Sequence, residues 1–141
     1  MGGGILCRNG SDPTICYNII KMNNTVEGGG CAFIDSDPYF CRNQVINNEA
    51  VRGGGLMLDN SSTEIAHCVF AKNIASEDAG GILMITANQP TIKSSVFYQN
   101  RGMSIGSIDC SNSMADITHN CFFGTEGIDS VSYTHLTLPT N

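Results

Sequence analysis

Gly53-Gly54-Gly55-Leu56-Met57-Leu58 is one copy of a block that recurs along the chain. A glycine triplet also occupies residues 2–4 and 28–30, and the weaker copies Ala79-Gly80-Gly81 and Ile105-Gly106-Ser107 follow. The first residues of the five blocks are 26, 25, 26 and 26 positions apart. A fixed period of this length is typical of a repeat protein, in which each repeat packs on its neighbours.

A second motif follows each glycine block, and Cys68-Val69-Phe70-Ala71-Lys72-Asn73 is part of one copy. Each copy has a leading apolar residue, a second apolar residue five positions later and, in four copies, an Asn eight positions later. These columns are Ile15, Phe40, Ile65, Ile92 and Ile117; Ile20, Val45, Phe70, Phe97 and Phe122; and Asn23, Asn48, Asn73 and Asn100, with Thr125 in the fifth copy. After the glycines, apolar residues alternate with period two, which predicts extended strands.

Two repeat architectures fit a period near 25 residues. The spacing from Ile65 to Asn73 matches the frame of a leucine-rich repeat. In the rest of each copy, however, glycines precede another strand pattern, and Gly costs about 1 kcal/mol relative to Ala in a helix. The sequence therefore predicts an all-β fold, a right-handed single-stranded parallel β-helix. This solenoid would have about five coils of about 25 residues.

In such a solenoid each residue stacks on its equivalent, about 4.8 Å away in the next coil. The two apolar columns are expected to line the interior, and the Asn column to form a corner ladder of amides. A second inward turn column is expected at Asn18, Asn43, Cys68, Ser95 and Asn120. The glycines predict a corner where positive φ or close approach between coils excludes a Cβ. Two columns are expected to face outward: Leu6, Ala32, Met57, Leu83 and Asp109, and Cys16, Cys41, Ala66, Lys93 and Thr118.

Composition restricts the possible partners. The chain has 141 residues, enough for at most one domain, with seven Lys or Arg against 13 Asp or Glu and a net charge of −6. Nucleic acid is therefore not an expected partner. No apolar run of about 18 residues predicts a membrane span. Residues 1–20 also lack the apolar stretch of a signal peptide.

The paired motifs resemble a known family. Gly-Gly-Gly-apolar blocks together with Cys68–Asn73 and Ser95-Val96-Phe97-Tyr98-Gln99-Asn100 resemble polymorphic outer membrane protein repeats, whose signatures are GGA(I/L/V) and FxxN. More broadly, they are similar to bacterial right-handed β-helix repeat proteins. The resemblance covers about residues 1–128. It departs at Gly30 and Gly55, where the family favours Ala, and the columns of the first two copies hold Ile20 and Val45 instead of Phe.

That resemblance implies a secreted or cell-surface passenger, extracellular or at the outer membrane in the full-length protein. Its expected role is structural or adhesive, with no catalytic, cofactor-binding or metal-binding residue to carry over. Its expected partner is an extracellular or host-surface carbohydrate or protein, bound through regions outside this sequence. The alternative is part of a carbohydrate-active β-helix enzyme, a polysaccharide lyase or glycoside hydrolase, on the analogy of fold alone.

Residues 129–141 are expected to form a separate, non-native or irregular tail after a β-helix at 1–128. The stretch Val131–Thr140 resembles a transposase sequencing adapter translated in frame, and a natural capping strand is the alternative. The leading residue lies 13 positions before the next glycine block in three copies, and the same count from Ile117 reaches residue 130, where no block is found. With Met1 directly against a glycine block, both ends are expected to be cut from a longer chain.

Carboxylates near the turns are the candidates for chemistry. Asp35 and Asp59 fall near equivalent turns of adjacent coils. The separation of two carboxylates stacked one coil apart would suit glycoside hydrolysis. The same two residues with Asp37 and Asn60 offer oxygen ligands for calcium. Asp and Asn are also the residues that turns favour, and the sequence favours that role. We therefore predict no catalytic, cofactor or metal site.

Histidines and cysteines give no catalytic or metal signature. His67 and His119 share a column two coils apart, roughly 10 Å, which is too far to share a metal, and His135 lies in the tail. No CxxC motif occurs among Cys7, Cys16, Cys31, Cys41, Cys68, Cys110 and Cys121. Most are expected to be thiols, four of them in inward columns. Cys16 and Cys41 are stack neighbours that can form a disulfide if their Cβ vectors allow it.

Overall fold

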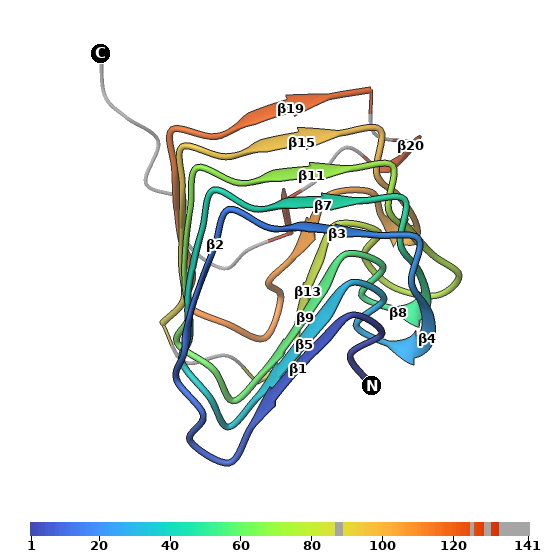
Figure 1. Cartoon of the computed structure of the whole chain (residues 1–141). Helices are drawn as coiled ribbons and strands as arrows, with labels where there is room; N and C mark the ends of the chain where they lie inside the picture. Colours follow the sequence, from blue (N-terminus) through green and yellow to red (C-terminus); the bar gives the residue numbers. More distant parts are fainter. Residues whose placement is uncertain (87–88, 125, 129–130, 133–141) are drawn as a thin grey trace.

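The computed structural model describes residues 1–86, 89–124, 126–128 and 131–132, and these form an all-β parallel solenoid. Each coil contains four short strands, and equivalent strands of successive coils form four parallel sheets, named A to D here (Figure 1). No helix occurs among the described residues. The predicted fold class is confirmed.

The strands of each sheet follow one another along the solenoid axis. Sheet A contains β1 (Ile5–Arg8), β5 (Cys31–Ile34), β9 (Leu56–Asp59), β13 (Ile82–Met84), β17 (Ile108–Asp109) and β21 (Val131–Ser132). Sheet B contains β2 (Thr14–Cys16), β6 (Tyr39–Cys41), β10 (Glu64–Ala66), β14 (Thr91–Lys93) and β18 (Asp116–Thr118). Sheet C contains β3 (Ile19–Lys21), β7 (Gln44–Ile46), β11 (Val69–Ala71), β15 (Val96–Tyr98) and β19 (Cys121–Phe123). Sheet D contains β4 (Asn24–Glu27), β8 (Glu49–Arg52), β12 (Ile74–Ala75), β16 (Arg101–Ile105) and β20 (Glu126–Ile128).

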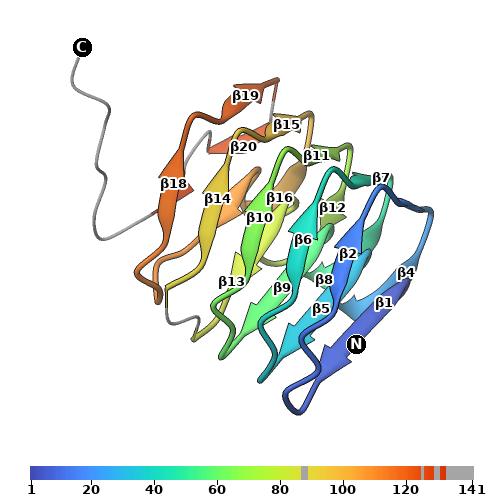
Figure 2. The same cartoon turned by 60° about the vertical axis from the view of Figure 1, so that its left-hand side comes forward.

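The solenoid is right-handed. In Figure 1 the first coil runs clockwise, from β1 up through β2, across β3 and down β4. Figure 2, in which the left-hand side of that view comes forward, places the N-terminal coil on the right, so the later coils recede from the viewer in Figure 1. A clockwise path that recedes is right-handed, the usual hand for parallel crossovers.

The predicted apolar columns form the core. Ile15, Phe40, Ile65, Ile92 and Ile117 pair in register through sheet B, and Ile20, Val45, Phe70, Phe97 and Phe122 through sheet C. Phe70, Phe97 and Phe122 stack, with ring centroids 5.1 and 5.0 Å apart. Interior members of both columns, such as Phe70 and Phe97, are fully buried, so this apolar surface supplies the main hydrophobic stabilisation.

Amide side chains bond one coil to the next at two corners. Between sheets C and D, the Asn23 amide donates to Oδ1 of Asn48 (2.9 Å), Asn48 to Asn73 (3.0 Å) and Asn73 to Asn100 (3.0 Å). Between sheets B and C, the second inward column makes similar contacts, as where the backbone N–H of Asn18 donates to Oδ1 of Asn43 (2.9 Å). Both predicted columns are confirmed, and they satisfy backbone groups that the turns would leave unpaired.

Glycine is required at the corner between sheets D and A for two reasons, at different positions. Gly28 has a φ of +64°, in the left-handed region that favours glycine. A Cβ on Gly30 would lie 2.6 Å from the carbonyl oxygen of Gly55 in the next coil, closer than van der Waals contact allows. Both predicted causes are therefore present.

The expectation that one column faces solvent is wrong. Ala32, Met57 and Leu83 are buried, with relative exposures of 0%, 1% and 4%, in a second cluster with Ala79 and Ile105. They point away from the main core, but the glycine corner folds over the outer face of sheet A; a Cβ on Gly28 would lie 2.8 Å from that of Ala32. In the other column, Cys41 and Ala66 are also buried.

The parallel ladder continues after residue 128. In β21, Val131 pairs with Ile108 and Ser132 with Asp109 of β17. Residues 133–141, most of the predicted tail, lie outside the described residues. The boundary at 128 and the adapter resemblance stay predictions.

Candidate functional site

The carboxylates singled out from the sequence bond to neighbouring coils. Asp35 and Asp59 are offset by one position, because Asp59 pairs with Ile34. Asp35 accepts a hydrogen bond from Nδ2 of Asn60 (2.6 Å), and Asp59 accepts one from Oγ1 of Thr86 (2.6 Å). Each carboxylate thus links its turn to the following coil.

Asp37, the third carboxylate considered as a calcium ligand, is arranged in the same way. Asp37 accepts a hydrogen bond from the backbone N–H of Ser62 (2.6 Å), while its own N–H donates to Asp12 (2.7 Å). In the part of the chain that the structure describes, no three His, Cys, Asp or Glu side chains come close enough together to hold a metal ion. The geometry fits the turn role of these residues.

Two rows of residues with positive φ flank the outer face of sheet C. The B–C row is Tyr17, Arg42, His67, Ser94 and His119, and the C–D row is Met22, Asn47, Lys72, Gln99 and Gly124. Each member except Gly124 directly precedes one residue of an inward amide or small polar column. A left-handed conformation costs a non-glycine residue roughly 1–2 kcal/mol, which the hydrogen bonds of that column offset.

The histidines lie where the sequence predicts. His67 and His119 are exposed members of the B–C row, two coils apart with Ser94 between them. His135 lies outside the described residues. The sequence reasoning did not identify the two rows themselves, although their signal is regular: each member except Gly124 comes directly before a residue of an inward polar column.

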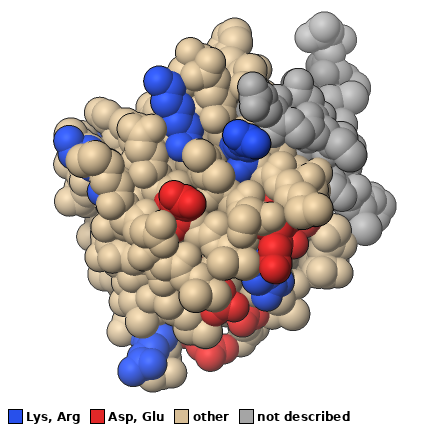
Figure 3. Space-filling view, turned by 90° about the vertical axis from the view of Figure 1, so that its right-hand side faces the viewer, with Lys and Arg blue, Asp and Glu red and all other residues tan. Residues whose placement is uncertain are grey.

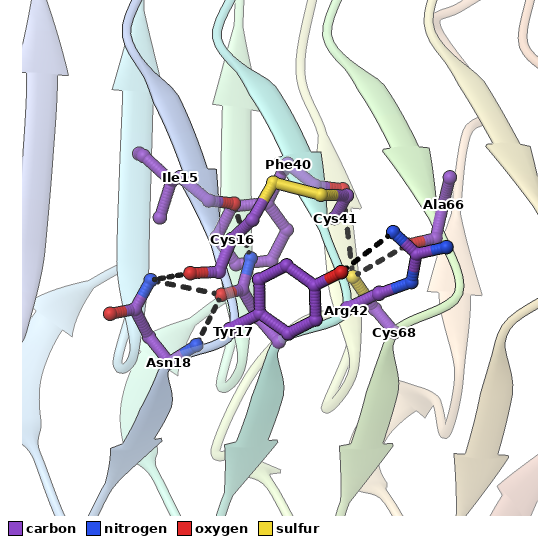
Figure 4. The surroundings of a disulfide bond; sticks show 10 residues. Ile15, Cys16, Tyr17, Asn18, Phe40, Cys41, Arg42, Ala66 and Cys68 are labelled. Carbon is purple, nitrogen blue, oxygen red and sulfur yellow. Dashed lines mark hydrogen bonds between the residues drawn. A yellow bond between two sulfur atoms is a disulfide. The ribbon is translucent and has the colours of Figure 1, made fainter.

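Cys16 and Cys41 form a disulfide between the first two coils, so the disulfide alternative is realised (Figure 4). Their Cα atoms are 4.6 Å apart, within the range that a disulfide spans. Beside it, Nη1 of Arg42 donates to the Tyr17 hydroxyl (3.0 Å), and the guanidinium carbon lies 5.4 Å from the ring centroid. Covalent, polar and cation–π contacts therefore join these coils at one place.

The remaining described thiols are mostly in the core. Cys7, Cys31, Cys68 and Cys110 are buried, whereas Cys121 is exposed. Burial raises the pKa of Cys68 to about 11 and that of Cys110 to about 12, and it also raises the pKa of Cys31 and Cys7. Since the thiolate is the reactive form, these buried thiols act as small apolar groups rather than nucleophiles.

Charge is distributed unevenly around the coil. The outward positions of sheet C and its two flanking rows carry Lys21, Arg42 and Lys72, and no Asp or Glu among the described residues. In the view onto the side formed by sheet D, the upper part, toward sheet C, carries Lys and Arg side chains, whereas the lower part carries most of the Asp and Glu side chains together with further Lys or Arg (Figure 3). A chain of net charge −6 thus keeps one face free of carboxylates.

A pocket of about 260 Å³ opens at the edge of this face, lined by Lys72, Ile74, Gln99, Arg101 and Gly124. Lys72 and Gln99 are successive members of the C–D row, and Ile74 pairs with Arg101 at the start of sheet D. Gly124 holds the next place in the row, with a φ of +54° and no side chain. The pocket therefore combines four side chains from two coils with the space left by a glycine in a third. A second hollow, of about 320 Å³, lies at the N-terminal end of the core, lined in part by Gly4, Ile20 and Asn23.

The two cations of the pocket differ from Arg52 and Lys93, which are ion-paired. Arg52 pairs with Asp78 (2.6 Å) and Lys93 with Glu64, and these hydrogen bonds raise the pKa of Arg52 and of Lys93. Neither Lys72 nor Arg101 forms an ion pair with any side chain that the structure describes. The pocket thus presents positive charge to solvent.

None of the described residues belongs to a helix of the length and apolarity that crossing a membrane requires. Comparison with protein-family models, with curated proteins and with solved structures finds no match to this chain.

Proposed function

We propose that this chain is a section of a secreted or cell-surface β-helix passenger, similar to bacterial polymorphic outer membrane proteins, with a structural or adhesive role and no catalytic activity of its own. One observation carries the proposal. Both halves of the repeated motif are internal to the stack, since Gly30 lies against the next coil and Asn73 is buried in the amide ladder. The motif residues therefore stabilise the stacking of the coils, and the residues at the outward positions can differ from one coil to the next.

The disulfide supports a location outside the cytoplasm. Disulfides persist in oxidising compartments and at cell surfaces and are rare in the cytosol. Cys16 and Cys41 join the first two coils, and the buried thiols elsewhere have raised pKa values, which disfavours exchange with them.

The carboxylates fit a role in the turns rather than in hydrolysis. A glycosidase needs two carboxyl groups that flank a bond of the substrate. Asp35 and Asp59 instead accept hydrogen bonds from Asn60 and Thr86 of the following coils. These hydrogen bonds at the turns are sufficient to explain the positions of both carboxylates.

An adhesion assay tests this proposal. Beads coated with the 141-residue protein would be incubated with cultured animal cells and with extracellular matrix, and beads coated with protein that has been reduced, alkylated and heat-unfolded would serve as the control. We expect the folded protein to retain beads on at least one surface at several times the control level. Retention at the control level on every surface would overturn the adhesive role.

A further inference from the structure

The pocket at the C–D corner has the chemistry to recognise an acidic sugar. We propose that Lys72, Gln99 and Arg101 form a subsite for a saccharide residue that carries one carboxylate. This inference rests on the proposed function, because it names the ligand chemistry of an adhesive surface. The proposal depends on the exposed cations of two adjacent coils and on the register that places them in one pocket.

Arg101 and Lys72 supply the recognition of the carboxylate. A guanidinium presents two parallel N–H groups that match both oxygens of a carboxylate, and an ammonium adds a further charged donor. Both side chains are exposed and line the same pocket. Since neither forms an ion pair with a described side chain, binding does not require an internal ion pair to break.

The other lining residues suit the sugar itself. The carboxamide of Gln99 both donates and accepts hydrogen bonds, as a hydroxyl-rich ring requires. Ile74 gives an apolar wall. Immediately before Gln99 and Gly124 in their coils lie Tyr98 and Phe123, which pair in register on the outer face of sheet C and have exposures of 41% and 56%. These rings offer an apolar platform beside the cations for the C–H face of a sugar.

The rest of the chain favours a single carboxylate over a dense polyanion. With a net charge of −6, the protein repels a polyanion at long range. Contacts within the pocket are short compared with a Debye length of about 8 Å at physiological salt, so one carboxylate still benefits from the two cations.

Titration of the full 141-residue protein with methyl β-D-glucuronide, followed by ¹H–¹⁵N NMR, tests the proposal. Methyl β-D-glucoside is the matched neutral ligand, and methyl glucoside 6-sulfate is the matched sulfated one. We expect saturable shifts at residues 72–74 and 98–101 with the glucuronide, and a Kd at least about tenfold higher for the other two sugars. Equal binding of the glucoside would overturn the role of the charge, and equal binding of the sulfate would overturn the assignment to a carboxylate.

Variants locate the site. Arg101→Gln and Lys72→Ala are each expected to raise the Kd for the glucuronide about tenfold. Lys21→Ala is the matched control, because it removes another exposed cation of sheet C that does not line this pocket, and we expect the Kd to stay within about twofold. All three positions are exposed, and circular dichroism checks that each variant is folded. An unchanged Kd in Arg101→Gln would overturn the proposal.

The bead assay separates this proposal from the adhesive role. Adhesion that persists in Arg101→Gln, together with no glucuronide binding by the unmodified protein, would overturn the subsite and leave the adhesive role intact. Glucuronide binding that Arg101→Gln weakens, without adhesion to any surface, would support the subsite and overturn the adhesive role.

Discussion

The side chain of Asn48 bridges three coils, and its contact with Asn73 is the central link. Nδ2 of Asn48 donates to Oδ1 of Asn73 (3.0 Å) in the following coil and to the carbonyl oxygen of Ile20 (2.9 Å) in the preceding one. Oδ1 of Asn73 also accepts the backbone N–H of Asn48 (3.1 Å). Because both side chains are buried, no water replaces these bonds if one partner is lost.

Asn73→Ala is therefore expected to lower the free energy of unfolding by about 2–4 kcal/mol, since it removes the acceptor of the Asn48 backbone N–H, one bond of the Asn48 side-chain amide and a donor to the Val45 carbonyl. Urea denaturation measures the change. Asn23→Ala is the matched control in the same column, because Asn23 is only partly buried, and its loss should be about half as large or less. Equal losses in the two variants would contradict the cooperative ladder.

Phe97→Ala is expected to destabilise the protein by about 3–5 kcal/mol, because it removes a fully buried ring between two stacked neighbours. Phe122 belongs to the same column but is 39% exposed, so Phe122→Ala should cost less than about 2 kcal/mol. Thermal unfolding of both variants checks this order. A larger loss in Phe122→Ala would show that the core does not follow the observed stack.

Alkaline pH is expected to destabilise the protein partly through Cys68. Burial raises the pKa of this thiol from its ordinary value of 9.0 to about 11. Between these values the unfolded chain has lost the proton that the folded protein still holds, so stability is full below pH 9 and falls as the pH rises toward 11. In Cys68→Ser, the slope of unfolding free energy against pH should be smaller by about 1.4 kcal/mol per pH unit.

Ser is a suitable replacement because Ser95 occupies the same column in the next coil and bonds to the backbone N–H of residue 68 (3.0 Å). Urea unfolding at several pH values between 8 and 11 measures the slope. Identical slopes for the two proteins would exclude a buried titrating thiol at this position.

Reduction of Cys16–Cys41 is expected to loosen the first coil. A disulfide that closes a loop of this length contributes about 3 kcal/mol, and here it ties coil one to coil two. Hydrogen exchange should become faster in residues 5–21 after reduction and stay unchanged in β10 and β11. Cys121→Ser, which removes an exposed thiol, is the control that should leave exchange unaltered. Unchanged exchange across residues 5–21 would contradict a stabilising role for the disulfide.

The sequence predicts the fold well because each column occurs in several coils. A residue such as Asn73 or Phe97 is identified by its equivalents at a fixed spacing, and register then follows from the period. Side-chain direction beyond the strand is harder to predict. Alternation shows that Met57 points away from the main core, but not that the glycine corner folds over it. Similarly, stacking places Cys16 beside Cys41 without giving the direction of their Cβ vectors.

The pocket could not be predicted from the columns. It depends on residues of the C–D row and of sheet D meeting at a corner, and on the absence of a side chain at Gly124. None of these features recurs from coil to coil, since Met22 and Asn47 hold the equivalent places of Lys72 in the first two coils. Repetition therefore identifies the scaffold, whereas the candidate site consists of the positions that differ between repeats.

Incubation of the 141-residue protein with a panel of neutral and uronate-containing polysaccharides, with retention and product release measured on the same samples, tests most directly whether this β-helix binds without catalysis. We predict that at least one polysaccharide with isolated uronate residues is retained, and that no new reducing ends or unsaturated products form. Release of such products by the unmodified protein, abolished in Asp35→Ala and Asp59→Ala, would contradict a non-catalytic scaffold.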